Sequence, residues 1–271
     1  MVVIKGLSDF SIHQIFDCGQ CFRFNGNPDG NVSGIAFSKF VTFKQEGDIL
    51  YIYNITDEEY ESRWKHYLAL DIDYAHIKRE ITERFGNDPT IKTAIEYGSG
   101  IRILRQEPWE MVCSFIISQN NNIPRIKKII ERMSAAYGEP IENGYAFPTP
   151  ESLYKAGIDA LEQLKMGFRA KYVYDAAEKI VTGKLNLEEV LASSTQDALR
   201  LLQNVKGIGL KVASCALLFG FDKYDVFPID VWMRRVLEKY YPNGLDIDAL
   251  GEYAGIAQQY LFYYERYTNL R

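Results

Sequence analysis

The sequence contains little histidine, little cysteine and no excess of positive charge. Its 271 residues include 3 His and 4 Cys, and the formal net charge is −5. A protein that coats nucleic acid normally has a basic surface, so this balance excludes nonspecific coating but leaves room for a small phosphate-binding site. Cys18 and Cys21 lack a second pair at zinc spacing, and the residues around them are expected to form a strand. We therefore predict no metal site and no redox site there.

Long hydrophobic runs are also missing. No segment reaches the length of a transmembrane helix, and nothing at the N-terminus resembles a signal peptide. The hydrophobic share of 47%, with 14% aromatic residues, is sufficient for a folded core. We expect a soluble, intracellular monomer of one or two domains that makes no membrane contact, located in the cytoplasm or nucleoid if it is prokaryotic.

Two periodicities divide the chain. Over residues 1–56 apolar side chains alternate around a turn at Gly47-Asp48, at Ile35, Phe37, Val41, Phe43, Ile49, Tyr51 and Tyr53. Period two predicts an antiparallel sheet. From about Asp57 the period is helical to the end, including a last long helix from Leu250 to Tyr264. The expected fold class is α+β, with a small N-terminal β-sheet domain and its following helices over 1–95, packed on an all-helical domain over 96–271.

A glycine hairpin stands before one of these helices. Gly207-Ile208-Gly209 follows an apolar helical stretch, and helical spacing resumes at Lys211. Glycine allows a tight turn and a close approach of the backbone. Free N–H groups at the start of the second helix can face an anion such as a nucleic-acid phosphate. By itself, this pattern also fits an ordinary connection between two helices.

Two charged residues make the hairpin a candidate catalytic site. Lys211 lies in the first helical turn, where the helix field and partial burial favour a neutral, nucleophilic amine. Asp230 follows 19 positions later, after Pro228, at the start of the next helix. As an N-cap it would stay ionised and could stabilise a positively charged sugar in a transition state. Taken separately, each residue also fits a structural role, as a surface lysine or a helix cap.

Hairpin, lysine and Pro-x-Asp together resemble the helix–hairpin–helix glycosylases with their Gly/Pro…Asp element, and most closely the 8-oxoguanine DNA glycosylases of the OGG type. The similarity runs from Cys-Gly-Gln-Cys-Phe-Arg at 18–23 to Ala-Gln-Gln-Tyr-Leu-Phe at 257–262. It implies a TBP-like sheet domain, a helix–hairpin–helix at about 197–220, and duplex DNA with 8-oxoguanine opposite cytosine as the partner. It also implies a bifunctional glycosylase and AP lyase without a cofactor, in which Lys211 attacks C1′ and β-elimination through a Schiff base cuts the strand.

Such an enzyme must hold the DNA open after extruding a nucleotide. Three successive asparagines at 120–122 suit an exposed turn, and their amides can bond base edges, although such a turn could simply cap the next helix. The resemblance makes Asn120 the residue that fills the gap and Arg125 a reader of the opposing cytosine. It makes Phe168, which we expect to be exposed, the aromatic wedge, and Arg169 a second reader of that cytosine.

The damaged base needs flat walls and a polar reader. Phe262 offers a stacking face, and Gln258 lies one helical turn before it on the same side. Cys215 lies one turn after Lys211. The resemblance makes Cys215 the second wall, and the carbonyl of Gly19 the acceptor for the N7–H that 8-oxoguanine has and guanine lacks.

Some positions depart from the family pattern. Trp232 stands where eukaryotic members tend to have His, Glu265 takes the place of the acidic partner of that His, and Ser214 replaces an acidic residue. In the family, that His–acid pair contacts the phosphate of the extruded nucleotide, so we expect Trp232 to alter this contact. Two other functions stay open: a helix–hairpin–helix glycosylase for another damaged base, such as an alkylated purine, and a hairpin module that binds DNA without catalysis.

Overall fold

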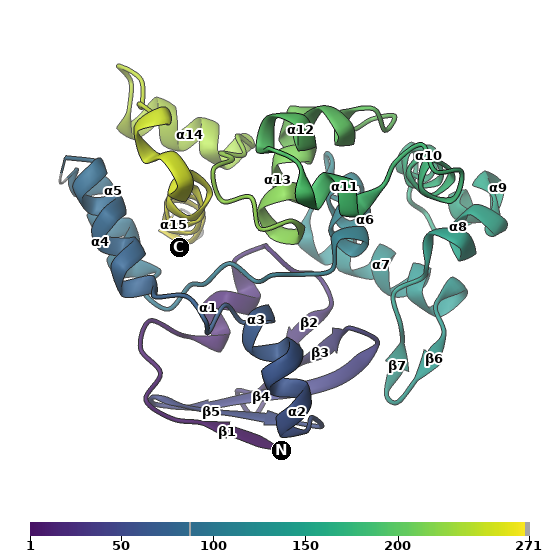
Figure 1. Ribbon diagram of the computed structural model, residues 1–271, viewed down its shortest axis with the longest axis horizontal. Helices are drawn as coiled ribbons and strands as arrows, with labels where there is room; N and C mark the ends of the chain where they lie inside the picture. The colour runs from purple at the N-terminus through teal and green to yellow at the C-terminus, as the bar shows by residue number, and fades with distance from the viewer. Residues whose placement is uncertain (87, 269–271) are drawn as a thin grey trace.

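An N-terminal antiparallel sheet lies against a body of helices in the computed structural model, which describes residues 1–86 and 88–268 (Figure 1). The order of its strands is β1-β5-β4-β3-β2. They are β1 (Val2–Ile4), β2 (Phe24–Gly26), β3 (Val32–Ala36), β4 (Lys39–Glu46) and β5 (Ile49–Tyr53). The α+β fold predicted from the two periodicities is confirmed.

The alternation in β4 and β5 has the expected consequence for burial. Val41 and Phe43 in β4 and Leu50 and Ile52 in β5 are fully buried, and Phe43 is the register partner of Ile52. Because neighbouring residues of a strand point to opposite faces, Ile49, Tyr51 and Tyr53 take the other, half-exposed face. The core of the sheet unit therefore lies on one face, under the short helices that follow it.

The turns of the sheet agree with the sequence at one end and differ at the other. Gly47 has a φ of 60° between β4 and β5, as the Gly-Asp turn predicts. Phe37, which the alternation placed in a strand, lies in the turn between β3 and β4 with a φ of 52°. Its ring packs edge-on against Trp64, with the ring centroids 5.6 Å apart. An apolar contact, not strand pairing, explains an aromatic residue at this position.

The segment before Cys18 is a helix, and the strand predicted around the Cys-x-x-Cys pair is wrong. In α1 (Ile12–Asp17) the N-cap Ser11 accepts a hydrogen bond from the backbone N–H of Gln14. The buried residues of α1, Ile12, Ile15 and Phe16, have helical spacing. The helix is six residues long. Such a short apolar run does not distinguish the two periods, and the cap decides.

Helices make up most of the remainder. They are α2 (Asp57–Glu59), the π-helix η1 (Tyr60–Trp64), α3 (Lys65–Tyr67), α4 (Tyr74–Arg84), α5 (Pro89–Tyr97), α6 (Pro108–Ser118), α7 (Ile123–Tyr137), α8 (Pro150–Ala156), α9 (Ile158–Gln163), α10 (Arg169–Val181), α11 (Leu187–Ala192), α12 (Thr195–Gln203), α13 (Leu210–Gly220), α14 (Val231–Tyr240), the 3₁₀-helix η2 (Asp248–Tyr253) and α15 (Ala254–Thr268). No helix of the described ranges combines the length and the apolar character that crossing a bilayer requires.

Two features interrupt the helical period that the sequence predicted to the end of the chain. A short hairpin of β6 (Pro140–Ile141) and β7 (Gly144–Tyr145) follows α7. The expected last long helix is divided, because Gly251, inside η2 and before α15, has a φ of 54° and a ψ of −129°. Glycine adopts this conformation without the strain that other residues meet.

An extended segment after α5 ties the sheet unit to the helical body. Buried Arg102 donates hydrogen bonds to the carbonyls of Ser8, Asp9, Ala69 and Ile72, at 2.6–3.1 Å. Just before this segment, buried side chains of α4 and α5 belong to the core of the helical body. The expected division at residues 95 and 96 thus falls inside α5, a helix that packs with the C-terminal part of the chain.

Candidate active site

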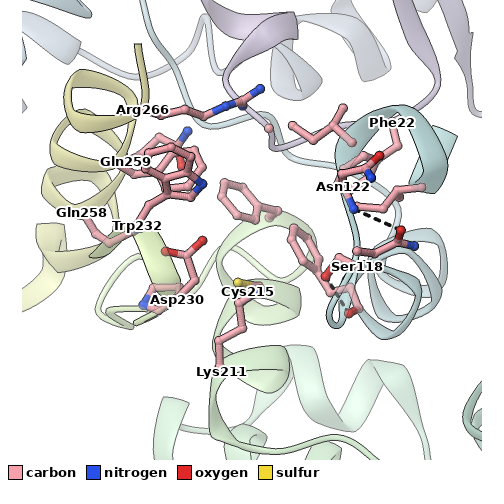
Figure 2. Close-up of a pocket in the computed structure, with 18 of the residues that line it drawn as sticks. Phe22, Ser118, Asn122, Lys211, Cys215, Asp230, Trp232, Gln258, Gln259 and Arg266 are labelled. Atoms are coloured by element: carbon pink, nitrogen blue, oxygen red, sulfur yellow. Dashed lines mark hydrogen bonds between the residues drawn. The ribbon is translucent and has the colours of Figure 1, made fainter. Parts of the chain in front are cut away.

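One cavity of about 350 Å³ collects the predicted catalytic residues and base-pocket residues from four parts of the chain (Figure 2). It lies where α6, α7, α13, α14 and α15 meet the loop after α1. Its lining includes Gly19, Lys211, Cys215, Asp230, Gln258 and Phe262. The six residues come from four separate segments of the sequence, so the fold itself brings these segments together.

Lys211 reaches the cavity from the second position of α13. The side chain is half-buried, and its ammonium nitrogen lies 5.8 Å from the centroid of the Phe115 ring. That ring stacks on Phe219, with the centroids 5.3 Å apart. A contact with a packed aromatic wall restricts where the amine can lie, which suits a nucleophile that must approach one carbon atom.

Asp230 reaches the same cavity from the N-terminus of α14, and the predicted N-cap is confirmed. Its Oδ1 atom accepts a hydrogen bond from the backbone N–H of Met233 at 2.9 Å. The cap fixes the carboxylate at the helix end, and Figure 2 shows the group directed into the cavity. A carboxylate fixed beside the space that Lys211 borders can stabilise positive charge there without first reorganising.

Cys215 lies between these two residues, in the wall formed by α13. Burial raises the pKa of its thiol, and the neighbouring charge of Lys211 opposes that shift. A thiol in its neutral form is a small apolar surface. Cys215 can therefore serve as an apolar wall of the cavity, which Phe262 also lines.

Gly19 enters the cavity through its backbone. It has a φ of 82°, and a Cβ atom at this position would lie 3.6 Å from the Phe262 ring. The segment is held from both sides, because Gln259 Nε2 donates to the carbonyl of Cys18 at 2.9 Å and Gln106 Nε2 donates to that of Gln20 at 2.8 Å. The position of the Gly19 carbonyl is therefore set by buried side chains.

The predicted hairpin joins α12 to α13. Gly207 has a φ of 81°, and an added Cβ would lie 2.3 Å from the Tyr172 ring, so both conformation and space require glycine. Gly209 is the N-cap of α13, with an ordinary φ of −92°. A Cβ there would meet no described atom within 4 Å. Gly209 thus leaves open space in front of the first N–H groups of the helix.

The asparagine loop lies between α6 and α7 as an exposed turn, as predicted. Asn120 is exposed with a φ of 46°, which asparagine tolerates better than most residues. Asn122 caps α7 by accepting from the N–H of Arg125 at 3.0 Å, and Asn121 Nδ2 donates to the carbonyl of Ile117 at 3.0 Å. The flanking amides thus hold the turn, which leaves the side chain of Asn120 and that of exposed Arg125 at the surface.

The Phe168–Arg169 pair divides into one exposed and one buried residue. Phe168 is 48% exposed, as expected, while Arg169 is only 3% exposed. The guanidinium of Arg169 donates to the carbonyls of Gln119, Asn120 and Met166. In this structure it therefore holds the asparagine loop, which differs from the expectation that it faces a cytosine.

The positions that depart from the family pattern lie beside the site. Trp232 lines the cavity, and the guanidinium of Arg235 lies 4.7 Å from the centroid of its indole. Glu265 is buried on α15, where its Oε2 atom is 3.2 Å from Lys239 Nζ. The tryptophan thus gives the cavity an aromatic edge, and the glutamate makes an ion pair with α14.

The Cys-x-x-Cys pair has a structural environment. Cys18 Sγ donates to the carbonyl of Ile15 at 3.2 Å, and burial raises the pKa of its thiol to about 12. Burial also raises the pKa of the Cys21 thiol. Within residues 1–86 and 88–268, no three His, Cys, Asp or Glu side chains are grouped as metal ligands.

Several residues of the cavity were not anticipated from the sequence. They are mainly aromatic and polar side chains, namely Phe22, Phe115, Phe219, Gln259 and Arg266. The aromatic residues have the ordinary spacing of core positions. Arg266 carries a usable signal, since it lies one helical turn after Phe262 and two after Gln258.

Known proteins share this fold and this hairpin. Residues 2–112 match the family described as 8-oxoguanine DNA glycosylase, N-terminal domain, and residues 113–248 match the family described as HhH-GPD superfamily base excision DNA repair protein. The fold and the hairpin thus define a base-excision repair protein of the helix–hairpin–helix class.

Solved structures narrow the class. MBOgg1, in complex with a low-affinity DNA ligand, is 41% identical with a TM-score of 0.93, over 98% of this chain and 96% of that one. The Clostridium acetobutylicum 8-oxoguanine glycosylase/lyase, in complex with double-stranded DNA containing cytosine opposite 8-oxoguanine, is 39% identical with a TM-score of 0.93, over 98% and 95%. The chain belongs to the 8-oxoguanine DNA glycosylase family. The Saccharomyces cerevisiae N-glycosylase/DNA lyase is 36% identical over 52% of this chain, which spans 42% of that relative.

Proposed function

We propose that this chain removes 8-oxoguanine from duplex DNA and then cuts the strand at the abasic site. The observation that carries the proposal is the convergence of an amine, a capped carboxylate and a base-sized space in one cavity. Lys211 and Asp230 supply the chemistry, and the remaining four predicted pocket residues border the space for the base.

Lys211 is the nucleophile in the proposed reaction. Its neutral amine attacks C1′ of the extruded nucleotide, the bond between C1′ and N9 breaks, and the base leaves with the electron pair and takes up a proton. The sugar ring then opens to a Schiff base with the lysine. Removal of a proton from C2′ breaks the bond between C3′ and its oxygen, which cuts the strand, and water releases the enzyme.

Asp230 acts through its charge. Positive charge develops on the sugar as the base departs, and a carboxylate already fixed by its helix stabilises that charge in the transition state. The hydrogen bond from Met233 at 2.9 Å uses Oδ1. Figure 2 shows the carboxylate facing the cavity that Lys211 also borders.

The base is selected by its edges and faces. Phe262 and Cys215 enclose the flat purine, and the amide of Gln258 pairs with its Watson–Crick edge. The carbonyl of Gly19 accepts the N7–H that undamaged guanine does not have. Guanine would instead leave that buried acceptor unpaired, which costs about 1–3 kcal/mol.

The rest of the interface holds the opened duplex. The free N–H groups behind Gly209 bind a backbone phosphate. Asn120 fills the gap, Phe168 wedges beside it, and Arg125 reads the opposing cytosine. Arg169 supports the loop of Asn120 by its hydrogen bonds to the carbonyls of Gln119 and Asn120. Its guanidinium can reach the opposing cytosine only if these hydrogen bonds break.

Cleavage of four duplexes, with 8-oxoguanine opposite each base in turn, tests the proposed function. We expect cutting at the lesion, fastest opposite cytosine, and no cutting of a matched duplex with undamaged guanine. A duplex with 3-methyladenine is the comparison. Preference for that base would instead indicate an alkylated-purine glycosylase, and no cleavage of any duplex would indicate a DNA-binding module.

A further inference from the structure

Arg266 is a charged residue of the cavity to which the proposed mechanism gives no role. It lies on α15 four residues after Phe262 and eight after Gln258, so all three side chains share one side of the helix. All three line the cavity. In Figure 2 Arg266 extends along the edge of the cavity opposite Lys211.

The guanidinium of Arg266 has an unused donor. Its Nη1 atom is buried and has no hydrogen-bond partner among the described residues. The group is held in place by Tyr267, whose ring centroid lies 5.0 Å from the guanidinium carbon. A buried donor without a hydrogen-bond partner is unfavourable, and a bound ligand that accepts its hydrogen bond is one explanation for such a group.

The neighbours of this donor indicate what it binds. A Cβ atom on Gly19 would lie 3.3 Å from Nη1 and 3.6 Å from the Phe262 ring. The donor is therefore beside the backbone segment and the ring that border the space for the base. A backbone phosphate would bind near the start of α13, which carries Lys211, and Figure 2 shows Lys211 and Arg266 at opposite edges of the cavity.

We propose that Arg266 is a specificity-determining residue that donates a hydrogen bond to a carbonyl oxygen of the extruded base. The inference rests on the proposed function. In 8-oxoguanine the N7–H lies between two carbonyl oxygens, at C6 and C8. If the Gly19 carbonyl accepts from N7–H, a cationic donor beside it complements the neighbouring oxygen. Guanine lacks both the N7–H and the oxygen at C8, so a bond from Arg266 to the C8 oxygen adds to the discrimination that Gly19 provides.

The test compares Arg266→Gln with wild type on two duplexes, one with 8-oxoguanine opposite cytosine and one with a preformed abasic site. Loss of a charge-assisted hydrogen bond to the base should slow excision about 10-fold to 100-fold. Strand cutting and borohydride trapping at the abasic site, which has no base, should stay within about 2-fold. Arg266→Lys should recover part of the excision rate, because it keeps a cationic donor.

Controls separate the possible failures. Arg63→Gln removes an arginine that lies over the Phe37 ring in the sheet unit, 5.0 Å from its centroid, and should change neither rate. Wild type that does not excise 8-oxoguanine would disprove the proposed function and leave Arg266 without a substrate. Equal loss on both duplexes would overturn the inference in favour of a phosphate contact or a structural role. Unchanged excision by a folded Arg266→Gln would overturn it outright.

Discussion

The two helices that carry the proposed catalytic pair begin in opposite ways. α13 starts at Gly209, which supplies no side-chain cap and has open space in front of it. α14 starts at Asp230, whose carboxylate bonds the N–H of Met233 in its own first turn. The first N–H groups of any α-helix lack partners within the helix. The start of α13 therefore leaves its N–H groups open to an external acceptor, whereas the start of α14 satisfies one of them with its own carboxylate.

This difference separates the proposed phosphate contact at α13 from the proposed electrostatic stabilisation at α14. An uncapped terminus with an exposed approach suits a phosphate that arrives with the DNA. A self-capped terminus fixes its carboxylate before any substrate is present, as electrostatic stabilisation requires. Lys211 is the second residue of α13, so a strand bound at that terminus would lie next to its amine. Changes on the two termini should therefore affect different measurements.

The largest effect should come from Lys211→Gln. Without an amine no Schiff base forms, so both strand cleavage and borohydride trapping should be lost on a lesion duplex, while binding of that duplex should persist. Gel shift and trapping on the same samples check both parts. Lys206→Gln, in the exposed part of the hairpin, is the matched control and should still trap. Normal trapping by Lys211→Gln would refute its role.

Asp230 offers a way to separate its cap from its charge. Asp230→Asn keeps a good N-cap and removes the charge, so excision should fall roughly 10²–10³-fold with little change in stability. Asp230→Ala removes both and should lose about 1 kcal/mol of unfolding free energy as well. Single-turnover kinetics and urea denaturation give the two numbers. Wild-type excision by the asparagine variant would show that the carboxylate serves only as a cap.

The two glycines of the hairpin should respond differently to one methyl group. Gly207→Ala forces a φ of 81° on alanine and puts its Cβ 2.3 Å from Tyr172, so it should destabilise the fold by about 2–4 kcal/mol. Gly209→Ala should cost under about 1 kcal/mol of stability. It should instead weaken DNA binding about tenfold, because the methyl group occupies the space left for a phosphate. Equal behaviour in melting and binding would contradict this division.

The smallest expected effect concerns the pH dependence of stability and a residue at a third helix start, that of α6. Glu110 in its first turn is buried, which raises the pKa of its carboxyl to about 7 even though Arg23 lies 3.6 Å away. Folding thus raises the pKa of this carboxyl from about 4.3, its value in the unfolded chain, to about 7. The folded state binds the proton more tightly, so the free energy of unfolding falls as the pH rises from about 4.3 through 7. Between pH 6 and 8 the loss should be about 1 kcal/mol. Glu110→Gln should remove this part of the slope in urea titrations, and an unchanged slope would disprove the assignment.

The sequence predicted those features that depend on local pattern. Alternation placed β4 and β5 in a sheet, and the glycines at 207 and 209 placed the hairpin. The segment before Cys18 was predicted wrongly, because six residues with apolar side chains fit either period and only the cap at Ser11 decides. Phe37 was placed in a strand because an aromatic residue in a turn leaves no separate signal.

The site was predicted where residue type restricts the chemistry. Lys211 and Asp230 stand out because amines and carboxylates at helix starts have few structural reasons to be paired. Arg169 and Arg266 show the limit, since an arginine in a sequence does not reveal which carbonyls it bonds. The burial of Arg169 by loop carbonyls and the unused donor of Arg266 follow only from three-dimensional packing.

The most direct test of the central claim is to locate the covalent bond. Wild-type protein is trapped with borohydride on a duplex carrying 8-oxoguanine opposite cytosine, digested, and its DNA-bound peptide sequenced by mass spectrometry. The adduct should lie on Lys211 in the first turn of α13. Attachment to any other residue, or excision without an adduct, would show that this amine is not the nucleophile.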